Sequence, residues 1–298
     1  MEAQYYEDKR QAGNWQKSSP LNDYVKVFLF ALFFIGIVVM LQWGLMDYRT
    51  VPHFSDNQAL RKALDQQQPL MLHYKLLLEI VLGMLLFRVL TPLRKDGFKI
   101  IWQYGVMALC VFLITAFLIT VTMFSMFGGI PLIPLLFLLS SGTSAALNLY
   151  TGMAAMSFIW GKSSPLDGKE RWTKMILAYV IIFVLMAIAW NVTNMLRNTM
   201  VTDYSGLAAA LIYILAGAAA GTVMTWMLVP FRKTNFHLKL PYLITGAGLL
   251  ILEILLIILF GTGILPHSLF SLFFFQESVE VMLSALFGVL LIQGFYQI

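Results

Sequence analysis

The chain has 298 residues, of which 59% are hydrophobic and only 12% are charged. Soluble domains carry about 25% charged residues, and no soluble core could bury so large an apolar fraction. The composition therefore excludes an ordinary soluble protein and indicates that lipid is the solvent for most of the chain.

The net charge of +5 and the isoelectric point near 9.2 allow for a nucleic-acid partner. However, the basic residues lie in the segments that flank apolar stretches, where they determine the orientation of membrane helices. We therefore expect a lipid bilayer as the main partner and no nucleic acid.

Apolar stretches long enough to cross a membrane recur along the whole chain. A helix needs about 20 mainly apolar residues to span the hydrocarbon. Eight stretches qualify: 27–46, 72–89, 100–126, 131–160, 175–196, 206–229, 240–260 and 269–296. Strands of a membrane barrel would instead alternate apolar and polar residues. The predicted fold class is an all-α integral membrane protein, a bundle of about eight transmembrane helices.

The distribution of positive charge predicts the orientation of this bundle. Positively charged loops are retained in the cytoplasm. With the N-terminus inside, the inner segments hold 15 of the 20 Lys and Arg residues and the outer segments hold 5. We expect both termini to be cytoplasmic, with a polar segment at residues 1–26 and the transmembrane domain at 27–298. The first stretch lacks a small-residue cleavage site and is expected to stay as an anchor.

Acidic residues inside apolar stretches are the first candidates for function. Charged groups at membrane depth are costly and by default mark proton or ion paths. The acidic residues in question are Glu79, Glu253, Glu277 and Glu280. Glu253 is the deepest, so it must find a partner on another helix or be protonated. We expect Glu79, Glu253 and Glu277 to form a proton relay, although a structural hydrogen bond between helices explains Glu253 equally well.

A second group of polar side chains gathers near the predicted outer ends of the stretches. Its main members are His73, Asn191, Asn194 and Arg197. Such residues could hydrogen-bond the carbonyl groups of a quinone, and histidine could exchange protons with it because it titrates near neutral pH. The alternative is that polar, aromatic and histidine residues simply collect at any membrane interface.

Metal and haem sites have few candidate ligands. The single cysteine, Cys110, excludes a cysteine zinc site and a cysteine-ligated iron–sulfur cluster within the chain. The four histidines all lie in predicted loops or at the ends of stretches, whereas a transmembrane b-type haem needs two histidines facing one another inside the bilayer. We expect no metal and no haem bound by this chain.

The most specific string in the sequence opens the fourth stretch and covers residues 131–146, Pro-Leu-Ile-Pro-Leu-Leu-Phe-Leu-Leu-Ser-Ser-Gly-Thr-Ser-Ala-Ala. It resembles a segment of the polysulfide reductase/NrfD family of membrane subunits, in which a similar proline-led string opens the fourth helix. Residues 82–94, which run into a basic, proline-containing turn, are similar to the second helix of that family. Small residues in the first string would also permit close helix packing, whatever the family.

The resemblance implies a membrane anchor of a multi-subunit oxidoreductase in a prokaryotic plasma membrane. Such a subunit holds no metal itself and exchanges electrons between menaquinone or ubiquinone and an attached iron–sulfur subunit. The implied partners are a ferredoxin-like protein and often a molybdopterin or multihaem subunit. By location alone, the family's quinone pocket corresponds to the outer group that contains His73, Asn191, Asn194 and Arg197.

Two other functions stay open. A secondary transporter or channel could use the carboxylates at Glu253, Glu277 and Glu280, although transporters tend to show repeats and broken helices that do not stand out here. A scaffold subunit could keep the fold without a quinone site of its own. No phosphate-binding loop, nucleophile elbow or zinc helix suggests a catalytic centre within the chain.

Overall fold

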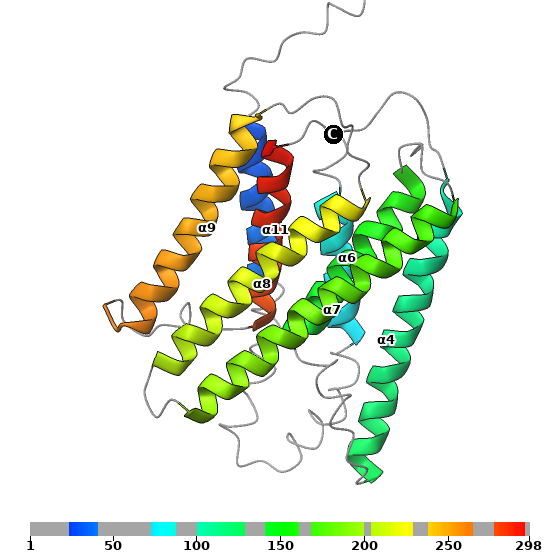
Figure 1. Ribbon diagram of the computed structural model, residues 1–298, viewed down its shortest axis with the longest axis horizontal. Coiled ribbons are helices and arrows are strands. Elements are labelled where there is room, and N and C mark those ends of the chain that lie inside the picture. The colour runs from blue at the N-terminus through cyan, green and yellow to red at the C-terminus, as the bar shows by residue number, and fades with distance from the viewer. Residues whose placement is uncertain are drawn as a thin grey trace, which may run out of the picture.

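The computed structural model describes residues 24–40, 73–87, 100–128, 141–160, 168–199, 204–228, 238–264 and 277–295. Each of these ranges contains one helix, and the described part of the chain is all helical apart from short turns (Figure 1). In chain order the helices are Tyr24–Met40, 73–87, α4 (Trp102–Gly128), α6 (Ser141–Trp160), α7 (Gly168–Thr199), α8 (Tyr204–Leu228), α9 (Leu240–Gly261) and α11 (Glu277–Phe295).

Four of these helices are long and apolar enough to cross a membrane: Gly168–Leu196, Gly206–Leu228, Leu240–Gly261 and Glu277–Phe295. A helix satisfies its own backbone hydrogen bonds, so it can lie in lipid without unpaired polar groups. The all-helical class expected from the sequence is therefore confirmed for the described residues, and the four long apolar helices are compatible with a protein embedded in a membrane. Each described helix also overlaps one of the eight apolar stretches.

Local sequence signals explain where α9 begins and ends. Pro241 occupies the first turn, where its missing N–H costs no hydrogen bond. At the other end, the N–H of Thr262 donates to the carbonyl oxygen of Ile258 at 2.9 Å. Gly263 follows with a φ of 74°, a left-handed conformation that suits glycine and stops the helix.

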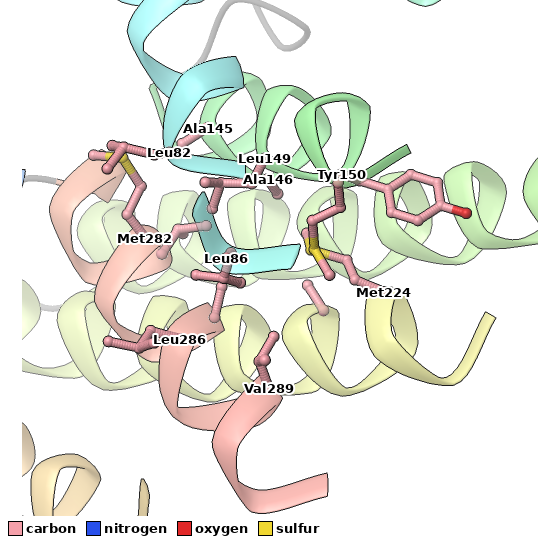
Figure 2. Packing of buried hydrophobic residues seen from close by; sticks show 14 of the residues in the cluster. Leu82, Leu86, Ala145, Ala146, Leu149, Tyr150, Met224, Met282, Leu286 and Val289 are labelled. Atoms are coloured by element: carbon pink, nitrogen blue, oxygen red, sulfur yellow. The ribbon is translucent and has the colours of Figure 1, made fainter. Parts of the chain in front are cut away.

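Helix α11 is the most buried element. It packs most extensively against α8 and also contacts α9 and α6. Every residue from Ser278 to Leu290 is buried. Figure 2 shows Met282, Leu286 and Val289 of α11 beside apolar side chains from α6, α8 and the helix at 73–87.

Glycines let the backbones of α8 and α11 touch. A Cβ atom added at Gly221 would collide with the carbonyl oxygen of Ala285, and one added at Gly288 would collide with that of Ala218. Gly217 stands one turn before Gly221 and has no room for a side chain either. Because lipid tails are as apolar as leucine, such close packing, rather than burial from water, holds membrane helices together.

The helix at 73–87 approaches α6 in the same way. A Cβ atom at Gly83 would collide with the backbone of Leu149, and one at Gly152 would collide with the carbonyl oxygen of Ile80. These two glycines thus bring the two backbones into direct contact. This crossing positions the first candidate site.

Two backbone hydrogen bonds between helices show antiparallel neighbours. The N–H of Lys239, at the start of α9, donates to the carbonyl oxygen of Gly294 near the end of α11 at 2.8 Å. The N–H of Ile101, just before α4, donates to the carbonyl oxygen of Phe158 near the end of α6 at 3.0 Å. Both bonds join the start of one helix to the end of another.

Candidate functional site: buried carboxylates between helices

The carboxylate of Glu79 is held between the helix at 73–87 and α6. Its Oε2 accepts hydrogen bonds from Asn148 Nδ2 at 2.7 Å and from Ser144 Oγ at 3.4 Å. Its Oε1 lies 3.6 Å from Nζ of Lys75. We call these four residues the Glu79 centre. Glu79 and Asn148 are only 2% and 1% exposed, so the carboxylate faces the protein interior and not the lipid.

Ordinary helical spacing assembles the Glu79 centre. Lys75 and Glu79 are four residues apart, as are Ser144 and Asn148, and residues at this spacing share a helix face. Asn148 Nδ2 also contacts Ser144 Oγ at 3.0 Å along α6. Each helix therefore contributes one pair of polar side chains, and the centre forms where the two pairs meet.

The glycine crossing explains why the two pairs meet. Gly83 follows Glu79 by one turn, and Gly152 follows Asn148 by one turn. Backbone contact at the glycines leaves a separation at the preceding turn that short polar side chains can bridge. The same glycines that pack the helices thus set the hydrogen-bond distances at Glu79.

A second polar contact lies one turn further along α6. The hydroxyl groups of Thr151 and Tyr179, which belongs to α7, are 3.1 Å apart. The rings of Tyr150 and Tyr179 make an edge-to-face contact with centroids 4.6 Å apart. The Tyr150 hydroxyl is buried without a hydrogen-bond partner among the described residues. Figure 2 shows the Tyr150 ring directed away from the labelled leucines and methionines of the core.

Glu253 lies at a different interface, on α9. It is 3% exposed, and neither of its carboxylate oxygens has a hydrogen-bond partner among the described residues. Glu280 on α11 interacts with it electrostatically. Glu280 is itself 2% exposed. Two packed helices, α9 and α11, therefore each carry one buried glutamate.

The third member of the expected relay, Glu277, is partly exposed in the first turn of α11. It precedes Glu280 by three residues and so lies on a neighbouring part of the same helix surface. The acidic residues thus fall into two groups, with Glu79 between its own helix and α6, and the others around α9 and α11.

The expected quinone residues come from two helices. His73 is the first residue of its helix, and its Nε2 lies 3.4 Å from Thr120 Oγ1 on α4. Asn191 of α7 is exposed, and its Nδ2 donates to the carbonyl oxygen of Ala187 in the same helix at 2.8 Å. Asn194 is partly exposed on α7. Arg197 belongs to α7, but its side chain lies outside the described residues.

Three members of the Glu79 centre carry no motif in the sequence. Lys75 counts there as an outer loop charge, and Ser144 as a small packing residue. Asn148 is a single amide in an apolar stretch. The available signal was the four-residue spacing from Lys75 to Glu79 and from Ser144 to Asn148, which predicts shared faces but not which face meets which.

Among the residues that the structure describes, no three His, Cys, Asp or Glu side chains gather in a way that would hold a metal ion. Comparison of the chain with protein-family models, with curated proteins and with solved structures finds no significant match. The functional argument therefore rests on the buried carboxylates themselves.

Proposed function

We propose that this protein is the membrane anchor subunit of a prokaryotic oxidoreductase complex and exchanges electrons between a membrane quinone and an attached iron–sulfur subunit. Reduction of a quinone to a quinol takes up two electrons and two protons, so such a subunit must also move protons. The observation that carries the proposal is the Glu79 centre. It places a buried ionisable carboxylate on the helix that begins with His73, with two hydrogen-bond donors on Oε2 and the Lys75 ammonium group 3.6 Å from Oε1.

In this proposal His73 exchanges a proton with the quinone at the outer membrane face, and Glu79 receives it. The two residues are six positions apart on one helix, which corresponds to about 9 Å along its axis. Lys75 lies between them in sequence and keeps the carboxylate charge balanced. Asn194 and Arg197 orient a quinone carbonyl, with Asn191 beside them.

The orientation follows from the Lys and Arg count. Eight membrane crossings with cytoplasmic termini place His73 at the outer face, along with the end of α7. The string at residues 131–146 supports the family, and its first ten residues lie outside the described ranges. Partners of the anchor would be a ferredoxin-like subunit and a molybdopterin or multihaem subunit.

The test is purification of the tagged protein from native membranes under mild detergent, followed by quinone extraction and iron analysis. We expect bound menaquinone or ubiquinone and an iron–sulfur protein that copurifies. Quinol oxidation by the complex should fall by at least tenfold in Glu79→Gln and stay near wild type in Glu170→Gln, a matched change at an exposed glutamate of α7 outside the expected relay. A preparation with neither quinone nor an iron–sulfur partner would refute the proposal.

A second candidate function is ion-coupled transport, which the burial of Glu253 and Glu280 on two packed helices favours. Intramembrane carboxylates are typical of proton and cation pathways. The two functions differ in what the isolated chain can do. A transporter in liposomes moves solute or protons without partner subunits, whereas an anchor subunit does not. If simultaneous replacement of His73 and Arg197 leaves turnover of a purified complex unchanged, the chain is a scaffold subunit instead.

A further inference from the structure

The starts of α4 and α7 meet at one corner of the bundle (Figure 1). The rings of Trp102 and Trp172 make an edge-to-face contact, with centroids 6.2 Å apart. A Cβ atom added at Gly168 would lie 3.5 Å from Nε2 of Gln103. The first turns of the two helices therefore lie side by side. We call the two tryptophans together with Lys169 the tryptophan corner.

Positive charge predominates at the tryptophan corner. The first two turns of α7 contain three cations and one anion, namely Lys169, Arg171, Lys174 and Glu170, whereas α4 has no charged residue. Glu170 is paired with Lys174 at 3.1 Å. Lys169 is exposed and forms no ion pair with any residue that the structure describes. The ammonium group of Lys169 is therefore available to an anion from outside the chain.

Exposed apolar side chains continue from each tryptophan along its helix. On α4, Val106 and Leu109 are four and seven residues after the tryptophan, so they share its helix face, and both are exposed. On α7, Ile176 and Val180 are four and eight residues after the other tryptophan and are exposed as well. Lys169 precedes that tryptophan by three residues and lies at the end of the same face. A cation, an indole ring and an apolar surface thus follow one another along α7, and α4 adds a second indole ring and a second apolar surface.

This order of side chains matches the parts of one phospholipid molecule. Indole rings of membrane proteins sit at the level of the lipid headgroups. Basic side chains beside membrane helices bind anionic headgroups, and the excess of positive charge favours an anionic lipid over a zwitterionic one. A free anion would use the lysine but neither of the two apolar surfaces.

We propose that the tryptophan corner binds one anionic phospholipid, with the lipid phosphate at the ammonium group of Lys169 and the acyl chains along the exposed faces of α4 and α7. The indole rings of Trp102 and Trp172 lie between the phosphate and the chains. The site goes beyond the function proposed above, because it needs neither a quinone nor a partner subunit.

Native mass spectrometry of the full chain in mild detergent measures the affinity for individual lipids. We expect dioleoylphosphatidylglycerol to bind more tightly than dioleoylphosphatidylcholine, which has the same chains but no net charge. In Lys169→Gln the affinity for the anionic lipid should fall by about fivefold, the factor that one lysine near anionic lipid contributes, and the affinity for the neutral lipid should stay unchanged. Lys169→Arg should keep the preference. Lys239→Gln is the matched control, because it removes the same charge at the start of α9, and it should bind as wild type does.

A second measurement locates the bound lipid. Phosphatidylglycerol with brominated chains quenches nearby tryptophan fluorescence, and one bound equivalent should quench a smaller fraction in Trp102→Phe/Trp172→Phe than in wild type. Equal fractions would place the lipid elsewhere and refute the proposal, as would equal affinities of wild type for the two lipids or equal losses in Lys169→Gln and Lys239→Gln. Displacement of the lipid by glycerol phosphate at the same concentration would show a site for a soluble anion. Loss of a copurifying protein from Lys169→Gln, with lipid affinity unchanged, would show a protein interface, and either result would overturn the proposal.

Discussion

At the Glu79 centre, a single side chain can contribute strongly to the stability of the fold. The Asn148 amide makes the shortest hydrogen bond to the Glu79 carboxylate, at 2.7 Å, and is itself buried. A hydrogen bond to a charged group contributes about 1.5–3 kcal/mol, and removing the donor leaves a buried acceptor unsatisfied. The stability of the crossing between the helix at 73–87 and α6 should therefore depend on this one side chain.

We accordingly expect Asn148→Leu to lower the free energy of unfolding in mixed micelles by about 1.5–3 kcal/mol. Asn191→Leu is the matched control, because the Asn191 amide is exposed and bonds only to its own helix. It should change stability by less than about 0.5 kcal/mol. Equal effects of the two substitutions would show that the Glu79 centre does not stabilise the fold.

The sequence identifies the buried carboxylates but not their surroundings. Glu79 and Glu253 stand out because a carboxylate in an apolar stretch is rare. The difference between them depends on which helices are neighbours: Glu79 accepts hydrogen bonds from Asn148 and Ser144, whereas Glu253 has no donor among the described residues. That information lies in contacts such as Gly83 to Leu149 and Gly246 to Phe287, which no single helix encodes.

At the scale of the helix, glycine position decides whether two backbones can touch. Ala is favoured over Gly in a helix by about 0.5–1 kcal/mol, so a neutral position should gain stability from this change. At Gly221 the added methyl group would meet the carbonyl oxygen of Ala285, which is backbone and cannot turn away. At Gly248 of α9 there is nothing within 4 Å.

We predict that Gly221→Ala separates α8 from α11 and lowers the melting temperature of the detergent-solubilised protein by several degrees. Gly248→Ala should leave the melting temperature unchanged or raise it slightly. Thermal unfolding followed by circular dichroism measures both. A tolerated alanine at Gly221 would contradict the close packing of these helices.

The apolar stretches predict the approximate positions of the helices, whereas the exact helix ends depend on interactions between neighbouring side chains. Helix α7 begins at Gly168, earlier than the apolar stretch that predicts it. Its first turns are polar and are supported by Glu170 and Lys174, whose charged groups are 3.1 Å apart. A prediction from apolar residues alone places the start of the helix too late, because it leaves out the turns with charged pairs. Such pairs stabilise the part of a helix that lies in water.

At the scale of the whole molecule, the proposed orientation predicts which loops face the cytoplasm. The chain has only one cysteine, so Cys110→Ala gives a cysteine-free background. In that background we expect a cysteine placed at Ser55 to react with a membrane-impermeant maleimide in intact cells. A cysteine at Ser164 should react only after the membrane is opened. The reverse pattern would place the termini outside and exclude the proposed quinone face.

The arrangement of the helices could not be predicted from the apolar pattern. In a soluble protein the buried face of a helix is apolar and the exposed face is polar, but in lipid both faces are apolar. Helix α11 is almost fully enclosed, while α9 exposes large side chains such as Ile251 and Leu255, yet both read as continuous apolar stretches. Which helix is enclosed and which one is exposed to lipid therefore depends on how the helices pack, and not on how apolar each of them is.

The enclosed position of α11 also affects how the protein is made. It follows the other seven described helices in the chain, so a ribosome delivers it to the membrane after all of them. Until then α6, α8 and α9 lack the surface against which they pack in the finished protein. Until α11 arrives, the faces of these three helices that it covers are therefore open to lipid, whereas α7 with α8 and α4 with α6 can already pack.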